Sequence, residues 1–390
     1  CHNVGLLDTM GKIMLTFVVF FLILSILVII HELGHYWVAK KNGIYVEEFG
    51  FGLPPRLFGI KIGETIYSWN WLPFGGFVRL YGEDAEGEGE YMVDGKIIPK
   101  KRAFYAQKPW RKASVIVAGV VMNIILAVVL FAGAYSFTGI PQLTDRVQVI
   151  DITESSPAKN AGLMAQDVIK AISPEGGETV MINSVKEFVD VVGANKGKQI
   201  MVDVVRKVDD GEVETMVSVI PRVDPPAGEG SLGVVVSQEV INKFYPWWQM
   251  PFLGAWEGMK EAFAWAVMII QMLGMMVMTI LRGNVPEGVA GPVGIYQVTG
   301  DVVNYGWLAV VRFLGVLSLN LAVMNILPLP ALDGGRLWFV IYEAITGKRV
   351  KPAWERRIHG VGMILLLSLI VLVTVSDVAR LFSFDLQRIF

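Results

Sequence analysis

The chain has 390 residues, of which 53% are hydrophobic and 18% are charged, and its formal net charge is −2. A composition this apolar is typical of an integral membrane protein that also carries a water-soluble part. The nearly balanced charge provides no overall basic field, so we expect no nucleic-acid partner. The single cysteine, Cys1, excludes an internal disulfide and a zinc site built from cysteines.

The first apolar run, Ile13 to Ile30, contains eighteen residues and no charge. At 1.5 Å per helical residue it covers most of a bilayer. A signal peptide is the alternative, but beyond Lys12 no basic region precedes the run and no small-residue cleavage site follows it. We therefore expect a membrane helix.

Directly after this run comes His31-Glu32-Leu33-Gly34-His35. Residues four apart on a helix leave the same face, so both imidazoles can bind one Zn²⁺. Glu32 is then placed to act as the general base for a metal-bound water. These polar side chains are costly in lipid unless they face the protein interior. The motif predicts metal ligands His31 and His35 and a catalytic Glu32.

Residues 43–112 differ in character from the spans on either side. The segments Ile60–Ile62 and Thr65–Trp69, joined by Gly63-Glu64, predict a tight hairpin. We expect a membrane-associated β region here, with a simple loop domain as the alternative, and an acidic solvated loop over residues 83–90. Twelve Lys and Arg residues lie between Lys40 and Lys112. Positive charge marks the cytoplasmic side, so the metal motif lies toward the cytoplasm.

The second apolar run covers residues 113–137 and contains Asn123. A buried amide in a span either joins two helices or contacts substrate, and both interpretations remain open.

Residues 141–225 are soluble in character and alternate between strand and helix patterns. Ser156-Pro157-Ala158 with Ala161-Gly162-Leu163 and Asp167 resembles a PDZ domain of the bacterial protease type. Gln166 departs from that pattern, which usually has glycine before the aspartate. PDZ domains add a peptide strand to a sheet edge. We expect the strand near Val147 to be that edge, with a peptide as a possible ligand.

Residues 226–306 are expected to form a linker followed by an apolar helix at 262–281. The next span, 307–332, contains two polar amides and two prolines and ends at Asp333-Gly334-Gly335. A catalytic zinc needs three protein ligands and one open position, so Asp333 is the expected third ligand. A carboxylate at the cytoplasmic end of a helix is the alternative for Asp333.

The metal constrains the number of spans. If 262–281 crossed the membrane, Asp333 would end on the face opposite His31 and His35, and bonds of about 2 Å could not join them. We therefore expect four spans, 13–37, 113–137, 307–332 and 358–376, with 262–281 interfacial or partly inserted. His359 has no partner at ligand spacing and is expected at the interface.

The motif HELGH, the inserted PDZ-like region and Asn325-x-x-Pro328-x-Pro330-x-x-Asp333-Gly334 together resemble the site-2 protease family (peptidase family M50). The similar branch is that of the bacterial regulator-of-sigma-E protease, with a single PDZ domain. The resemblance implies Zn²⁺ and a multi-pass protein of the bacterial inner membrane. It also implies cleavage of a single-pass substrate trimmed beforehand, such as a membrane-bound anti-sigma factor or a signal-peptide remnant. The residues that it implies for substrate binding are Asn325, Pro328, Gly75 and Gly76.

The expected fold is a polytopic α-helical membrane protein with four transmembrane helices, a membrane-associated β region and an inserted extracytoplasmic α+β PDZ domain. A non-proteolytic PDZ-bearing scaffold is the main alternative, although the complete ligand set argues against it. A zinc transporter is disfavoured by the small number of spans and the lack of a repeat. The expected segments are 1–42, 43–112, 113–140, 141–225, 226–306, 307–336 and 337–390.

Overall fold

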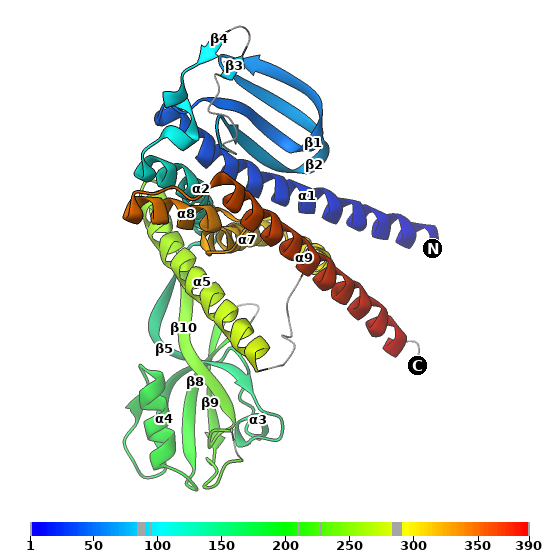
Figure 1. Ribbon diagram of the computed structural model, residues 1–390. Coiled ribbons are helices and arrows are strands. Elements are labelled where there is room, and N and C mark those ends of the chain that lie inside the picture. The colour runs from blue at the N-terminus through cyan, green and yellow to red at the C-terminus, as the bar shows by residue number, and fades with distance from the viewer. Residues whose placement is uncertain are drawn as a thin grey trace. The chain divides into compact units, whose positions relative to one another are not determined.

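The computed structural model describes residues 2–83, 91–93, 96–208, 211–226, 228–282 and 291–388. The acidic loop expected at 83–90 lies outside the described residues, apart from Glu83. The chain forms two compact units. One contains Cys1–Phe137 and Trp247–Phe390, and the other contains Thr138–Pro246. Each unit is described by itself below (Figure 1).

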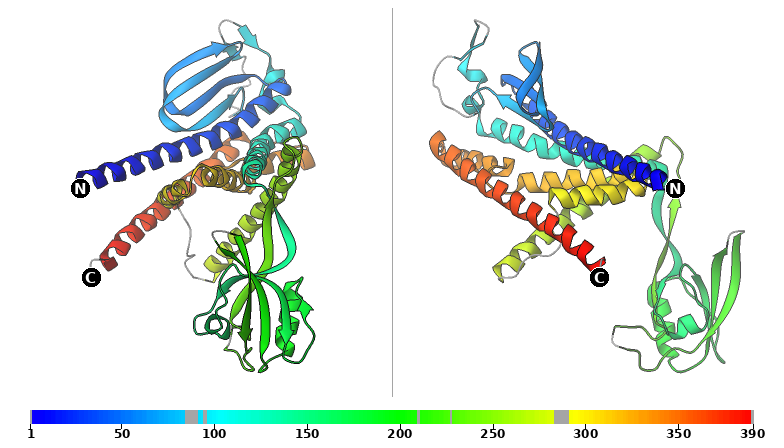
Figure 2. Two further views of the ribbon diagram at one scale, coloured as in Figure 1. Left: turned by 180° about the vertical axis from the view of Figure 1, so that it is seen from behind. Right: turned by 90° about the vertical axis from the view of Figure 1, so that its right-hand side faces the viewer.

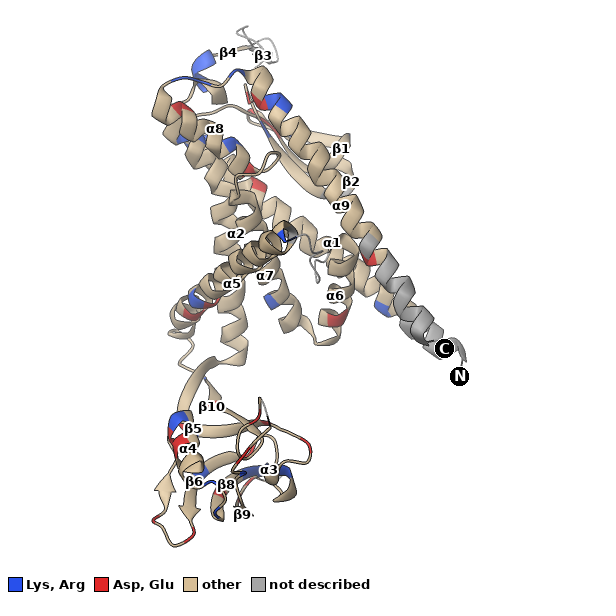
Figure 3. Cartoon of the chain, turned by 60° about the horizontal axis from the view of Figure 1, so that its bottom comes forward, with Lys and Arg blue, Asp and Glu red and all other residues tan. Residues whose placement is uncertain are grey.

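The first unit is built mainly from helices. In chain order they are α1 (His2–Lys41), α2 (Pro109–Thr138), α5 (Met250–Leu281), α6 (Pro292–Asn304), α7 (Trp307–Ile326), α8 (Asp333–Thr346) and α9 (Pro352–Arg388). Five of those that the structure describes, α1, α2, α5, α7 and α9, are long and apolar enough to cross a membrane. Figure 3 shows long stretches of them without a charged residue. The expectation of a polytopic membrane protein is thus confirmed, whereas length and composition alone do not separate four spans from five.

Two helix bounds differ from the expected ones. α7 ends at Ile326, and residues 327–332 connect it to α8, which begins at Asp333. The helix that we expect to reach Leu332 is too long, because Pro328 and Pro330 lack an N–H and clash with the preceding turn. α5 starts twelve residues before the expected segment 262–281, at Met250.

The β region of this unit is a hairpin of two long, bent strands, β1 (Val46–Ile62) and β2 (Thr65–Leu80). Phe49 lies opposite both Val78 and Tyr67, because each strand folds back along the other (Figure 1). The sheet therefore has four runs side by side, in the order 76–80, 46–51, 65–69 and 58–62. The short elements that follow are β3 (Tyr91–Val93), β4 (Lys96–Ile98) and two 3₁₀ turns, Lys100–Arg102 and Phe104–Ala106.

The second unit is an antiparallel sheet with two helices. Its strands are β5 (Ile140–Ile152), β6 (Val168–Pro174), β7 (Val180–Met181), β8 (Ile200–Val208), β9 (Gly211–Val219) and β10 (Val234–Lys243). They lie in the order β10-β5-β6-β8-β9, and β7 pairs with β6. The helices are α3 (Pro157–Asn160) and α4 (Val185–Ala194), whose N-caps are Ser156 and Ser184. Alternating Val and Ile side chains fill the core, with Phe188 from α4.

Two expectations for this unit are wrong. The expected linker contains β10, which pairs with β5 from Ile152 to Ile140. Its side chains from Val234 to Gln238 are alternately half-buried and exposed, although the sequence Val-Val-Val-Ser-Gln does not itself alternate. The strand near Val147 is therefore not an edge, because β10 and β6 cover it on both sides. At the two ends of this strand order, the open edges of the described sheet belong to β9 and β10, and the two-residue β7 pairs on one side only.

Candidate metal centre

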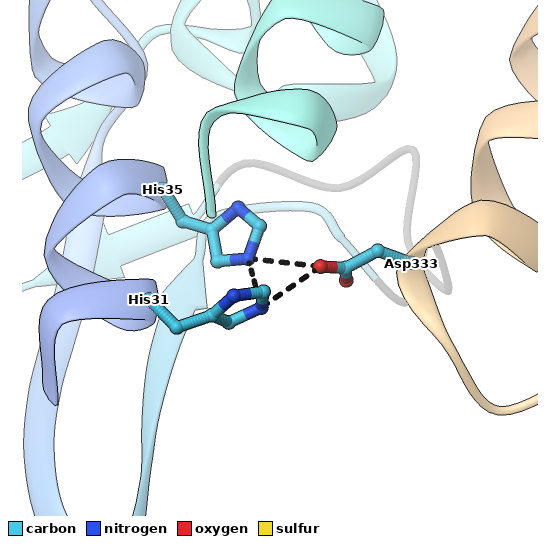
Figure 4. A group of neighbouring side chains, drawn as sticks. All are labelled: His31, His35 and Asp333. Atoms are coloured by element: carbon cyan, nitrogen blue, oxygen red, sulfur yellow. Dashed lines mark hydrogen bonds and ion pairs between the residues drawn. The ribbon is translucent and has the colours of Figure 1, made fainter. Parts of the chain in front are cut away.

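Three side chains from two distant parts of the sequence meet inside the helical unit (Figure 4). His31 and His35 project from one face of α1, one turn apart, toward Asp333 at the start of α8. Asp333 Oδ2 lies 3.0 Å from His31 Nε2 and 3.2 Å from His35 Nε2, and the two Nε2 atoms are 3.2 Å apart. The structure thus brings together the three residues that the sequence predicts as ligands.

This triangle fits a zinc ion. Tetrahedral zinc with bonds of about 2 Å holds its ligand atoms about 3.3 Å apart. The observed separations of 3.0–3.2 Å match that spacing, and the three donors are one carboxylate and two imidazoles. Three protein ligands leave the fourth position open, as in a catalytic rather than a structural site.

The outer nitrogen of each imidazole is also held. His35 Nδ1 donates to the carbonyl oxygen of Val115 at 2.8 Å, which leaves the lone pair on Nε2 for the metal. The Asn123 amide lies 3.3 Å from His31 Nδ1, and its Oδ1 has no hydrogen-bond partner among the described residues. Turned to present Oδ1, this amide accepts the Nδ1 proton and fixes His31 in the same tautomer.

Glycines let the helices approach at this centre. A Cβ on Gly119 of α2 would lie 2.6 Å from His35 Nε2 and 2.7 Å from His31 Cε1. A Cβ on Gly34 would lie 2.4 Å from the carbonyl oxygen of Ala118, and one on Gly334 would collide with the backbone before α8. Only hydrogen fits at these positions, so α1, α2 and α8 can meet around the ligands.

A cavity of about 770 Å³ opens beside the metal centre. Glu32, His35 and Asp333 line it, together with the run 76–80 of the hairpin. A Cβ built on Gly76 would lie 3.5 Å from Glu32 Cγ, so this run passes directly over the proposed base. Within the described chain, residues 76–80 pair with 46–51 on one side only. Their other edge is therefore available to an extended segment.

The hairpin is fixed to α1 beyond the metal motif. Glu64 lies in the turn between β1 and β2. It accepts two hydrogen bonds of 2.8 Å from the Arg102 guanidinium and one of 2.8 Å from Lys40 Nζ. The Arg102 bonds and then Lys40 lower the pKa of Glu64 to about 2. Tyr36 and Tyr67 are joined by their hydroxyls at 2.6 Å. These contacts fix the position of the hairpin along the axis of α1.

The other expected site residues lie at different distances from the centre. Asn325 Nδ2 is 3.3 Å from His31 Nε2. Asn123 is fully buried and contacts His31, while its backbone oxygen accepts from Ser318 at 2.8 Å. A Cβ on Gly75 would meet the Leu53 side chain. Pro328 lies in the connection between α7 and α8, and is exposed.

Sequence reasoning misses two features here. Lys112 is 2% exposed and donates to both oxygens of Glu343, at 3.0 and 2.8 Å. In the sequence, Lys112 is one of the twelve basic residues from Lys40 to Lys112, and nothing there indicates a buried ion pair. His359, expected at the interface, accepts a hydrogen bond from the Ala331 N–H at 3.0 Å. A long apolar helix and a proline-rich turn gave no signal that they would meet.

The sequence profile of Peptidase family M50 matches residues 19–369. The chain is 32% identical to a Clostridium perfringens protein over 91% of this chain and 96% of that protein. It is 31% identical to the zinc metalloprotease RasP of Shouchella clausii, over 94% of this chain and 100% of that protein. The zinc metalloprotease RasP of Oceanobacillus iheyensis is 30% identical to it, over 95% of this chain and 100% of that protein. The chain therefore belongs to peptidase family M50, and the expected zinc metalloprotease of the site-2 type is confirmed.

Proposed function

We propose that this protein is an intramembrane zinc endopeptidase that performs regulated proteolysis of transmembrane substrates. The observation that carries the proposal is the meeting of His31, His35 and Asp333 beside Glu32. His31, His35 and Asp333 would hold a zinc ion, which would supply a water molecule of lowered pKa. Glu32 takes the proton of the attacking water and returns it to the leaving amine.

The substrate segment must be extended before it is cut, because the peptide bonds of a helix are shielded by their own hydrogen bonds. The open edge of 76–80 offers backbone partners to such a segment, beside Glu32. The Asn325 amide, 3.3 Å from His31 Nε2, can donate to a substrate carbonyl. Pro328 and the turn at Gly75 and Gly76 complete the proposed substrate-binding set.

Contacts at the far ends of the helices support four spans. The backbone N–H groups of Gly291 and Gly294 each donate to Asp377 at 2.9 Å, and the Tyr296 hydroxyl donates to the Ile13 carbonyl. On α1, Ile13 lies eighteen residues before His31, and on α9, Asp377 lies eighteen residues after His359. Each of these distances is about 27 Å along the helix axis. In Figure 2, α6 lies between α1 and α9.

The start of α6 is then nearly one bilayer thickness away from the metal centre. With the metal centre toward the cytoplasm, α5 begins and ends on the outer side and does not cross. Labelling of a cysteine introduced at Tyr305, which is 83% exposed, in a chain whose Cys1 is replaced by serine tests this arrangement. We expect reaction with an impermeant reagent from outside the cell; protection there, with labelling only after lysis, would indicate five spans.

We assign the protein to the bacterial inner membrane, with the unit 138–246 on the outer side as a PDZ domain. A peptide strand, if this unit binds one, has the open edge of β10 available, close to α4. Substrates are single-pass proteins already trimmed by another protease, such as an anti-sigma factor or a signal-peptide remnant.

The test uses the purified full-length chain in proteoliposomes with a single-pass substrate that lacks its outer domain. We expect His31→Ala, His35→Ala and Asp333→Ala to lose both zinc and cleavage. Glu32→Gln should keep about one zinc per chain and lose cleavage by about 10²-fold or more. Glu154→Gln, at an exposed carboxylate of the other unit, is the matched control. Retained cleavage by Glu32→Gln would refute its role as base.

A non-proteolytic scaffold that works through its outer unit is the alternative. It predicts that the purified chain holds no stoichiometric zinc and that Glu32→Gln changes nothing. The spacing of the three donor atoms, 3.0–3.2 Å, argues against it, because a scaffold has no need to keep such a polar set inside a membrane unit.

A further inference from the structure

The connection that carries Asp333 has an unusual backbone. Residues 327–332 have no helical conformation, and Ala331 adopts a φ of +76°. A non-glycine residue in the left-handed region costs about 1–3 kcal/mol and persists only when its surroundings impose it. Ala331 lies two residues before Asp333, so whatever imposes its conformation also sets where α8 begins.

One such constraint is a side chain of α9. His359 Nδ1 accepts a hydrogen bond of 3.0 Å from the Ala331 N–H. The His359 ring also packs edge-on against Phe339 of α8, with centroids 5.6 Å apart. Its Nε2 is buried and has no hydrogen-bond partner among the described residues. The polar contact of this imidazole is thus the backbone of the Asp333 connection.

A second contact from α9 lies one turn further along the same helix. A Cβ built on Gly362 would lie 2.2 Å from Pro330 Cβ and 2.8 Å from its carbonyl carbon. Residues three apart face the same side of a helix, so His359 and Gly362 together form one face that receives Pro330 and Ala331. The connection is held both by a hydrogen bond and by close packing.

We propose that His359 is a positioning residue for the metal centre, acting through the Ala331 backbone to set the place of the Asp333 carboxylate. The inference rests on the proposed function of Asp333 as a ligand. His31 and His35 come from one helix, so α1 sets the spacing of their backbones, and α2 holds both imidazoles. The third ligand comes from a different element, and its distance from the other two depends on how the connection is held.

The chemistry of the acceptor provides a sharp test. The Oδ1 of asparagine can occupy the place of His Nδ1, whereas the amide of glutamine lies one bond further out, near the place of Nε2. His359→Asn therefore keeps an acceptor for the Ala331 N–H, and His359→Gln, of similar polarity, does not. His359→Leu removes the acceptor altogether.

The experiment measures zinc retention by the purified full-length chain against a graded chelator, with cleavage kinetics at limiting and at excess zinc. We expect His359→Gln and His359→Leu to bind zinc about 10-fold more weakly, as is typical when a ligand loses its supporting hydrogen bond. We expect His359→Asn to stay near wild type. Excess zinc should restore kcat of the Gln variant with an unchanged KM.

Two results would overturn the inference. If all three variants retain zinc like wild type, the hydrogen bond does not position the ligand. If the Asn variant loses as much zinc as the Gln variant, ring packing against Phe339 is what matters. Should the Leu variant fail to fold, comparing His359→Asn with His359→Gln still tests whether the hydrogen bond to Ala331 is needed for zinc binding. Asp333→Ala tests the ligand assignment separately from the role of His359, since zinc retained in that variant would refute Asp333 as a ligand.

Discussion

Gly119 of α2 faces His35 of α1 so closely that a methyl group on it would lie 2.6 Å from the Nε2 atom that points at the metal. The same methyl would lie 2.7–2.8 Å from two atoms of His31. The position is therefore part of the metal centre, although glycine contributes no ligand. It keeps the second helix near enough for Val115 and Asn123 to hold the outer nitrogens of the two imidazoles.

We expect Gly119→Ala to lose zinc and cleavage together, because the added carbon must displace at least one imidazole or push α2 away. Zinc content after gel filtration and cleavage of the proteoliposome substrate measure the effect. Gly133→Ala is the matched control on the same helix, since no atom of the described residues lies within 4 Å of its added Cβ. That variant should keep both properties and gain up to about 1 kcal/mol in helix stability. Normal zinc content in Gly119→Ala would contradict the proposed arrangement.

The carboxylate of Glu64 predicts a pH-dependent attachment of the hairpin. Its pKa is lowered to about 2 by Arg102 and Lys40, against an ordinary value of 4.5. Between these values the unfolded chain binds more protons than the folded one, so stability rises with pH across this window. The stabilisation is present above pH 4.5 and is lost as the pH falls toward 2.

We therefore expect wild type to melt at a higher temperature than Glu64→Gln at pH 6, and the difference to shrink steadily below pH 4.5. Thermal unfolding of the detergent-solubilised chain at a series of pH values measures it. Because the Glu64 side chain is 34% exposed, solvent screening keeps the effect modest. A difference between the two proteins that is independent of pH would refute the charge-based explanation. Glu154→Gln serves as the exposed control.

Local chemistry made much of the centre predictable. The spacing of His31 and His35 fixes two donors on one helix face, and the need for a third polar ligand points to Asp333. The same logic cannot reveal which residues hold these donors in place. Gly119, Asn123 and His359 act through packing between spans, and an apolar helix has no periodic polar face from which its neighbours can be deduced.

In the fold too, the helices can be predicted from local sequence, whereas the pairing of a distant strand cannot. Apolar runs predicted the helices α1, α2, α7 and α9, and the prolines explain why α7 stops early. The strand β10 is not evident from the sequence, because its partner, β5, lies about ninety residues earlier, at the start of a segment that already reads as a complete domain over 141–225. Strand pairing depends on such distant partners, so alternation in one segment does not by itself identify it as part of a sheet.

Gln166 in the soluble unit offers a stabilising substitution. Its φ is +73°, a conformation in which glycine is unstrained and other residues are not. We expect Gln166→Gly to stabilise the unit by about 0.5–1 kcal/mol, after allowing for the greater freedom of glycine in the unfolded chain. Amide hydrogen exchange of β5 and β6 in the intact protein measures it, as roughly 2- to 5-fold slower exchange.

Gln166→Ala is the control for that change. It removes the same side-chain amide but keeps a Cβ, so it should bring no gain. The turn is otherwise secured by Asp167, which accepts from the Met164 N–H at 2.9 Å and from Arg206 at 2.7 and 2.8 Å. The hydrogen bonds to Asp167 also raise the pKa of Arg206, and neither substitution at residue 166 removes a partner of this ion pair. Equal protection in Gly and Ala variants would show that backbone strain is not the cause.

The buried ion pair between Lys112 and Glu343 should hold α8 against α2. Lys112 is 2% exposed, and its amine bonds both oxygens of Glu343, with Arg349 3.8 Å from one of them. Breaking a buried pair by removing one partner costs about 3–5 kcal/mol, because the remaining charge loses its compensation. Arg349 moderates that loss, so we expect Lys112→Met to lower the free energy of unfolding by about 3 kcal/mol.

The double variant Lys112→Met with Glu343→Met separates charge compensation from specific positioning. Replacing both partners with apolar side chains of similar volume removes the uncompensated charge, so most of the lost stability should return. Cleavage is a second readout, because α8 begins at Asp333 and its attachment to α2 runs through this pair. We expect the single variant to lose activity and stability together. A double variant that is stable but cleaves poorly would show that the ion pair also sets the position of α8. A double variant no more stable than Lys112→Met alone would show that the uncompensated charge is not the cause of the loss.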